Sequence, residues 1–203
     1  MTTVREKAID DFSLAAPEEM AAWSGACLLA SPMRLKFSFC GHTCEVLHPQ
    51  AEMQWSAAEE LHEEEEVLIL QYLAQATGLP FRERWLSFLE LPGGPHHDVP
   101  FRKEAHLPLA QGFAKHPQKL YAAARDWGGT AVKGYGDAAC IIPAFPRLPL
   151  LVVVWGQNEE FPARATLLFD ASAPGYLSTA SLYVMGIAVT RRIVQSGSFL
   201  SID

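Results

Sequence analysis

The sequence predicts an α+β fold, a mainly antiparallel sheet with helices packed on it in a single compact domain. Apolar residues make up 49% of the 203 residues, which suits one sizeable core. Helical and strand-like spacings occur in turn along the chain, and neighbouring strands are joined by short connections, as antiparallel pairing allows. Because no repeat or low-complexity tract divides the chain, residues 1–203 are expected to form one domain.

The chain is expected to begin with two helices and a hairpin. Apolar residues recur at helical spacing from Val4 to Phe12, and Pro17 suits the first turn of a second helix. Residues 35–39 then alternate between apolar and polar side chains, and the pattern resumes at 43–47 after Gly41-His42. This predicts a hairpin with its turn at Gly41-His42.

A long helix is predicted next. Ser56 and Glu59 have the spacing of a capping box, and Gly78 and Pro80 end the helical pattern. The four consecutive apolar residues 67–70 indicate that its second half is deeply buried. The glutamates at 63–66 are interpreted as a solvated face rather than a cation site.

The second half of the chain is expected to be rich in strands. Residues 85–91 have a strand pattern, and a helix is predicted from His116-Pro117 to Gly128-Gly129. Further strands are predicted at 139–142, 150–155 and 165–169. Since 150–155 is apolar throughout, it should be a central strand buried on both faces, covered by a final helix over about 179–194.

Composition excludes several classes of protein. The formal net charge is -7 and basic residues do not cluster, which argues against nucleic-acid binding. No apolar run approaches the ~20 residues that a membrane-spanning helix needs. The first residues lack the pattern of a secretory signal, so a cytoplasmic location is expected, with the four cysteines as thiols or metal ligands.

Several motifs occur in an order that resembles a known family. They are EVLILQYL at 66–73, WLSFLELPGG at 85–94, GDAA at 136–139, WGQNEEFPA at 155–163 and LLFD at 167–170. Together they are similar to the family catalogued as domain of unknown function 3786. The resemblance implies a protein of anaerobic bacteria or archaea, where relatives are sometimes fused to an iron-sulfur domain. This chain lacks the cysteine-rich segment of the fused members, and it lacks acidic residues that relatives carry near Gln157 or Asn158 and near Thr179 and Ala180.

Cys40 and Cys44 are weak candidates for metal ligands. Two thiols and an imidazole within CGHTC are soft donors that suit zinc or an iron-sulfur centre. A two-residue turn at Gly41-His42 would place the thiols on opposite faces of the hairpin, whereas a three-residue turn would let them oppose each other. Two further ligands would still be needed, and buried thiols are the commoner outcome.

Other candidate motifs are short. The run His96-His97-Asp98 offers metal ligands or a general base, although an exposed polar loop is the favoured interpretation. No nucleophile elbow, Walker loop or Rossmann fingerprint is present, and the glycines at 134 and 136 indicate a simple turn.

The segment 155–161 is the strongest candidate for a ligand-binding site. Aromatic side chains beside carboxylates are suited to a cationic or planar ligand, and Trp155 and Phe161 are expected to share one hairpin. The alternative is a hairpin whose aromatics close the edge of the core while its glutamates are solvated. The candidate residues are Trp155, Glu159, Glu160, Phe161, Asp170 and Asp137.

These observations predict a non-catalytic protein that binds a cofactor or small molecule or acts as an accessory protein, and the resemblance implies a place in anaerobic metabolism. A tetrapyrrole or corrinoid is the expected cofactor class, and an iron-sulfur protein the expected partner. One alternative is a metal-dependent enzyme that uses Asp137, Glu160 and Asp170, or the cysteine pair. The other is a protein–protein adaptor with an exposed apolar patch.

Overall fold

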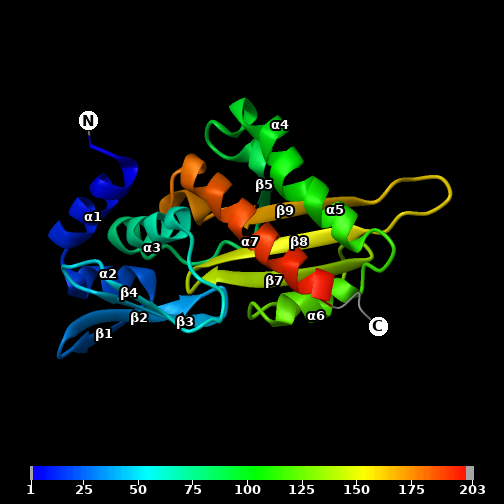
Figure 1. Ribbon diagram of the computed structural model, residues 1–203. Helices are drawn as coiled ribbons and strands as arrows, with labels where there is room; N and C mark the ends of the chain where they lie inside the picture. The colour runs from blue at the N-terminus through cyan, green and yellow to red at the C-terminus, as the bar shows by residue number, and fades with distance from the viewer. Residues whose placement is uncertain (1, 200–203) are drawn as a thin grey trace.

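Two antiparallel sheets with helices packed between and beside them make up the structure, a computed structural model that describes residues 2–199 (Figure 1). The first sheet has the strand order β1-β2-β3-β4, and the second has the order β5-β9-β8-β7-β6. Every strand pair is antiparallel. The predicted α+β class with a mainly antiparallel sheet is therefore confirmed.

The N-terminal part contains the two predicted helices and the predicted hairpin, extended by a short strand on each side. Thr3 caps the first helix, since its hydroxyl accepts the N–H of Glu6. The outer strands β1 and β4 were not predicted, because four and three residues are too few to show a clear periodicity. The elements are α1 (Val4–Leu14), α2 (Pro17–Ser24), β1 (Cys27–Ala30), β2 (Met33–Phe39), β3 (His42–Leu47) and β4 (Met53–Trp55).

The turn of the β2–β3 hairpin lies one residue before its predicted position. Phe39 pairs with His42, so Cys40 and Gly41 form the turn, with φ angles of 44° and 76°. Two consecutive positive φ angles match the twist of a tight hairpin. Gly41 is also required by packing, because a Cβ there would lie 2.6 Å from the backbone nitrogen of Gly128.

The long helix α3 (Glu63–Gln75) begins later than predicted. Ser56 does not cap it, because its hydroxyl accepts the N–H of Thr43 beside β4. Instead, the side chain of His62 bonds the backbone of Glu65, whose carboxylate accepts the N–H of His62 in return. The interpretation of 63–66 as a solvated face is wrong for Glu65, whose exposed fraction is 0%.

Glu65 is paired with Arg192 in the interior, in an arrangement that we call the Arg192 centre. The carboxylate accepts two hydrogen bonds from the guanidinium, at 2.9 Å from Nε and 2.7 Å from Nη2. The guanidinium carbon also lies 5.5 Å from the ring of Trp55 and 4.8 Å from that of Trp127. Such a charge is tolerated in a core only when it is paired, and this pair joins α3 to the C-terminal helix.

The segment between α3 and the strand-rich part of the chain is mostly helical. The predicted strand at 85–91 is only β5 (Trp85–Ser87), because Ser87 and Glu90 form a capping box that turns the chain. The predicted helix after His116-Pro117 starts at Lys119. The elements that follow β5 are η1 (Phe88–Glu90), η2 (Gly94–His96), α4 (Asp98–Phe101), the π-helical turn η3 (Arg102–His106), α5 (Leu107–Phe113) and α6 (Lys119–Arg125).

The last third forms the larger sheet and the long C-terminal helix. As predicted, the strand that contains residues 150–155 is central, and Leu150 to Val154 are buried. The helix α7 covers one face of this sheet and extends beyond its predicted end (Figure 1). The elements are β6 (Thr130–Ala131), β7 (Ala138–Phe145), β8 (Leu148–Trp155), β9 (Arg164–Asp170), η4 (Ala173–Gly175) and α7 (Thr179–Phe199).

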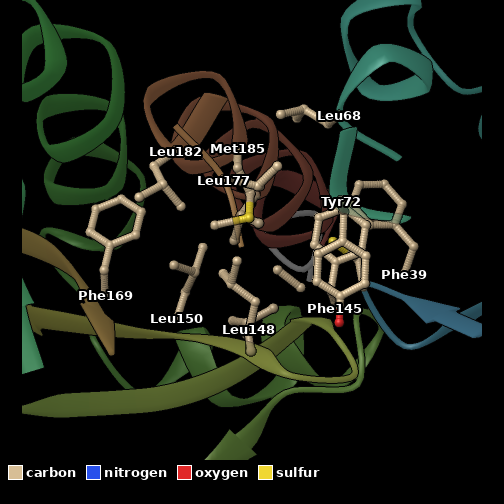
Figure 2. Packing of buried hydrophobic residues seen from close by; sticks show 14 of the residues in the cluster. Phe39, Leu68, Tyr72, Phe145, Leu148, Leu150, Phe169, Leu177, Leu182 and Met185 are labelled. Atoms are coloured by element: carbon tan, nitrogen blue, oxygen red, sulfur yellow. The ribbon is translucent and has the colours of Figure 1, made fainter. Parts of the chain in front are cut away.

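One continuous apolar cluster connects the two sheets. Figure 2 shows its centre, where Tyr72 of α3 stacks on Phe145 of β7 with ring centroids 4.1 Å apart. Met185 and Leu182 of α7 lie over Leu150 of β8 in the same view. None of the described helices is both long and apolar enough to span a membrane.

Candidate functional site

The predicted site residues of segment 155–161 lie on one hairpin, as expected, but they do not surround a common point. Trp155 ends β8, whereas Phe161 lies in the loop with 60% of its surface exposed. Glu159 and Glu160 are exposed in the same loop. The side chain of Asn158 shapes this loop by accepting the N–H groups of Glu160 and Phe161 at 2.9 and 2.8 Å.

Trp155 and Asp137 lie at the same end of the larger sheet. Trp155 is half-buried and pairs across the strands with Arg164, whose guanidinium carbon is 5.7 Å from the indole centroid. Asp137 accepts the N–H of Gly156 at 2.8 Å and donates its own N–H to Val154. Asp137 therefore fixes the end of β8, from which Trp155 projects.

Asp170 lies at the opposite end of β9, where it has a structural role. Its carboxylate accepts hydrogen bonds from the N–H of Arg82 and from the N–H and hydroxyl of Ser172. Burial acts to raise the pKa of Asp170, but these hydrogen bonds hold the pKa below its usual value. Asp170 lies six residue steps from Arg164 along β9, a distance of about 20 Å, so Asp170 is remote from Trp155 and Asp137.

Cys40 and Cys44 are both buried thiols. Burial raises the pKa of each to about 12, so both stay protonated at neutral pH. Among residues 2–199, no three or more His, Cys, Asp or Glu side chains gather in a group that could hold a metal ion.

A pocket of about 520 Å³ runs along the edge of β9 and brings Trp155 together with residues that were not predicted. One wall comes from β9 and the adjoining loop, and the other comes from α4, η3 and α5, which lie beside β9 in Figure 1. We call it the β9 pocket. Its lining residues are Ser87, Asp98, Arg102, His106, Leu107, Ala110, Trp155, Ala163, Arg164, Ala165 and Thr166.

The π-helical turn η3 places His106 in this pocket. Pro108 follows closely and has no N–H to donate to a carbonyl one turn back, which favours a wider turn at this point. The His106 ring packs against Phe101, with centroids 5.3 Å apart, and its Nε2 atom is buried without a hydrogen-bond partner. Burial, helped by the positive charge of Arg102, lowers the pKa of His106 to about 4, so the imidazole is neutral at pH 7.

An ion pair completes the wall opposite β9. Arg102 lies 2.8 Å from the carboxylate of Asp98, which is mostly buried, while the Arg102 side chain is 60% exposed. Asp98 belongs to the run His96-His97-Asp98, whose two histidines are exposed, as predicted, while Asp98 is not. The pocket thus offers an indole, a neutral imidazole and two guanidinium groups, one of which is already paired.

Sequence analysis missed His106 and Arg102 because they belong to a helical segment with no recognised motif. The one signal in the sequence was Pro108, since a proline inside a helical run indicates a disturbed turn, and π-helical turns are frequent at functional sites.

Comparisons with known proteins give one finding. The family model described as domain of unknown function (DUF3786) matches residues 16–192, which begin after α1 and end at Arg192. No curated protein and no solved structure matches the chain.

Proposed function

Because the chain belongs to the DUF3786 family, whose description names no activity, we propose a function from the β9 pocket. The protein is a non-catalytic accessory protein of anaerobic metabolism that binds a small planar cofactor of the tetrapyrrole or corrinoid class at the edge of β9. The single observation that carries this proposal is the unpartnered Nε2 of His106 in a pocket of about 520 Å³.

The chemistry of the lining supports a planar ligand. A volume of this size lies in the range that small-molecule sites use. Trp155 offers an aromatic face and an edge, and Arg164 offers a cation beside it. A neutral imidazole is both a hydrogen-bonding group and a ligand for the metal of a tetrapyrrole, so a bound cofactor would give Nε2 the partner that it lacks.

The positions of the acids favour binding over the metal-dependent enzyme alternative. Asp137 and Asp170 lie at opposite ends of the sheet and are engaged in backbone hydrogen bonds, and Glu160 is exposed in the loop. A pair of carboxylates that shares acid–base work needs to flank one reacting group. These three do not.

The test is a binding assay with a matched pair of histidine variants. His106 and His48 both have a buried Nε2 without a partner, but His48 lies beside Phe12, outside the β9 pocket. Binding of haem and of cobinamide to the purified protein is measured by absorbance titration. His106→Gln is expected to weaken binding at least about tenfold, while His48→Gln leaves it unchanged. If neither cofactor binds, or if the two variants behave alike, the proposal is wrong.

The adaptor alternative has one observation in its favour. The face of the larger sheet turned away from the main core forms a separate small apolar cluster around Ala139, Leu151 and Val153. Its border residues, among them Trp85, Ile141 and Leu168, remain partly exposed. Sedimentation of the wild-type protein and of Leu168→Asp tests this alternative, which predicts an assembly that the substitution dissociates.

A further inference from the structure

The edge of β9 is only partly covered by its neighbour. β5 pairs with Leu168, Phe169 and Asp170, and the chain then leaves the sheet after Ser87. Beyond that point the first half of β9 is an edge, and Ala165 on this edge lines the β9 pocket.

Three observations show that the main-chain N–H and C=O of Ala165 point away from β8, toward the open edge of β9. Ala171 donates its N–H to the carbonyl of Arg84, on the β5 side of β9. Ala165 lies six residues earlier, and main-chain groups at even separations along a strand point to the same side. Val154, the partner of Ala165 on β8, directs its carbonyl to Asp137, away from β9. The backbone of Leu167 bonds His106, which also lies on the edge side.

Ala165 is therefore left with a free donor and a free acceptor side by side. Neither the register of the sheet nor any hydrogen bond described for residues 2–199 gives its N–H or C=O a partner. At the neighbouring edge residue Leu167, His106 faces the carbonyl group. So short a free edge is too small for a partner protein to add a strand, but it fits a small group that both donates and accepts.

We infer that the ligand of the β9 pocket is bound through the main-chain N–H and C=O of Ala165 and therefore carries a carboxamide or lactam group. This inference rests on the proposed function and narrows it. A corrinoid ring bears carboxamides at its periphery, whereas a porphyrin bears carboxylates, which can accept from the N–H but cannot donate to the C=O.

Two corrinoids with the same ring test the inference. Cobinamide carries carboxamides and cobyrinic acid carries carboxylates, and the affinity of each is measured for wild type and for Ala165→Pro. Proline removes the N–H and is tolerated on an edge strand where that N–H is not in the ladder. Wild type is expected to bind cobinamide about tenfold more tightly than cobyrinic acid, because only the carboxamide can donate to the C=O of Ala165. Ala165→Pro is expected to keep the wild-type melting temperature and to lose about tenfold in cobinamide affinity.

Matched variants check the geometry. Ala165→Ser keeps the N–H and should bind cobinamide as wild type does. Thr166→Pro should melt lower, because Thr166 directs its N–H toward β8, into the ladder. A second measurement needs no variant: amide hydrogen exchange at Ala165 should slow about tenfold when cobinamide binds.

The outcomes separate the two proposals. If cobinamide binds but Ala165→Pro retains full affinity and the amide of Ala165 exchanges as before, the inference is wrong and the proposed function survives. If neither corrinoid binds, the inference is wrong, and the haem titration decides the proposed function.

Discussion

Two places in the described part of the molecule hold charged or polar groups away from water, and they differ in how completely those groups find partners. In the Arg192 centre, Glu65 and Arg192 are 0% and 2% exposed and satisfy each other through two hydrogen bonds. In the β9 pocket, the Nε2 of His106 and the main chain of Ala165 have no partner.

This difference separates structure from function. A fully satisfied polar network in a core stabilises one arrangement and leaves nothing for a ligand to bond. An incompletely satisfied network on a pocket wall costs stability, and a ligand can repay that cost by supplying the missing partner. Four changes break or sharpen this comparison.

The largest effect is expected at the Arg192 centre. Arg192→Ala removes the guanidinium that is closest to the buried Glu65 carboxylate and leaves it, among the described residues, only the N–H of His62 at 2.9 Å and Arg191 at 3.3 Å. The free energy of unfolding should fall by about 3–5 kcal/mol. Denaturant unfolding measures this loss. The double variant Glu65→Leu/Arg192→Met should recover most of it, because it leaves no unpaired charge. A double variant no more stable than Arg192→Ala would show that the charges themselves are required.

A smaller loss is expected at Trp155. Its side chain is half-buried, so Trp155→Ala should cost about 1–2 kcal/mol rather than the ~3–5 kcal/mol of a fully buried tryptophan. Ligand affinity should fall together with this modest loss. Phe161→Ala is the control, since that side chain is 60% exposed and both stability and binding should stay unchanged. A Trp155→Ala variant with wild-type melting and wild-type binding would show that Trp155 contributes neither to stability nor to ligand binding.

The pocket histidine should make stability depend on pH. The pKa of His106 is lowered from 6.5 to about 4, so the unfolded chain takes up a proton at a pH where the folded chain does not. The stability that neutral His106 contributes is therefore present above about pH 6.5 and is lost as the pH falls toward 4. The fall in melting temperature between pH 7 and pH 5 should be smaller in His106→Gln. An equal fall in melting temperature in both proteins would contradict the lowered pKa of His106.

The smallest effect is expected in the reactivity of the cysteines, of which three are buried and one is exposed. Burial raises the pKa of Cys40 and Cys44 to about 12 and that of Cys140 to about 11, whereas Cys27 is exposed. A maleimide at pH 7 should label Cys27 alone in the native protein and all four thiols after unfolding. Mass spectrometry counts the labels, and fast labelling of Cys40 would show that the hairpin turn opens readily.

Sequence reasoning succeeded where the physical signal is local. The apolar run 150–155 identified the central strand, and the alternation of residues 35–39 identified the hairpin. It failed where contacts between residues far apart in the sequence decide whether a side chain is buried. Nothing near Glu65 in the sequence reveals Arg192, so a buried glutamate was interpreted as solvated.

The candidate site was predicted in part for the same reason. Trp155 was found because its segment is an unusual connection between apolar strands, but the opposite wall comes from η3 and α5, which a short motif does not reveal. Asp170 was included because carboxylates suggest chemistry, whereas its bonds to Ser172 and Arg82 give it a structural role.

The pairing of Glu65 with Arg192 also has a consequence for synthesis of the chain on the ribosome. The two residues are 127 positions apart, so at ordinary translation rates Glu65 emerges roughly 6–25 s before its partner. During that interval α3 cannot bury its carboxylate without a large penalty, although its apolar neighbours favour collapse. The first sheet and α3 are therefore expected to stay loosely packed on the ribosome until α7 emerges, and a chain truncated before residue 192 would never close its core.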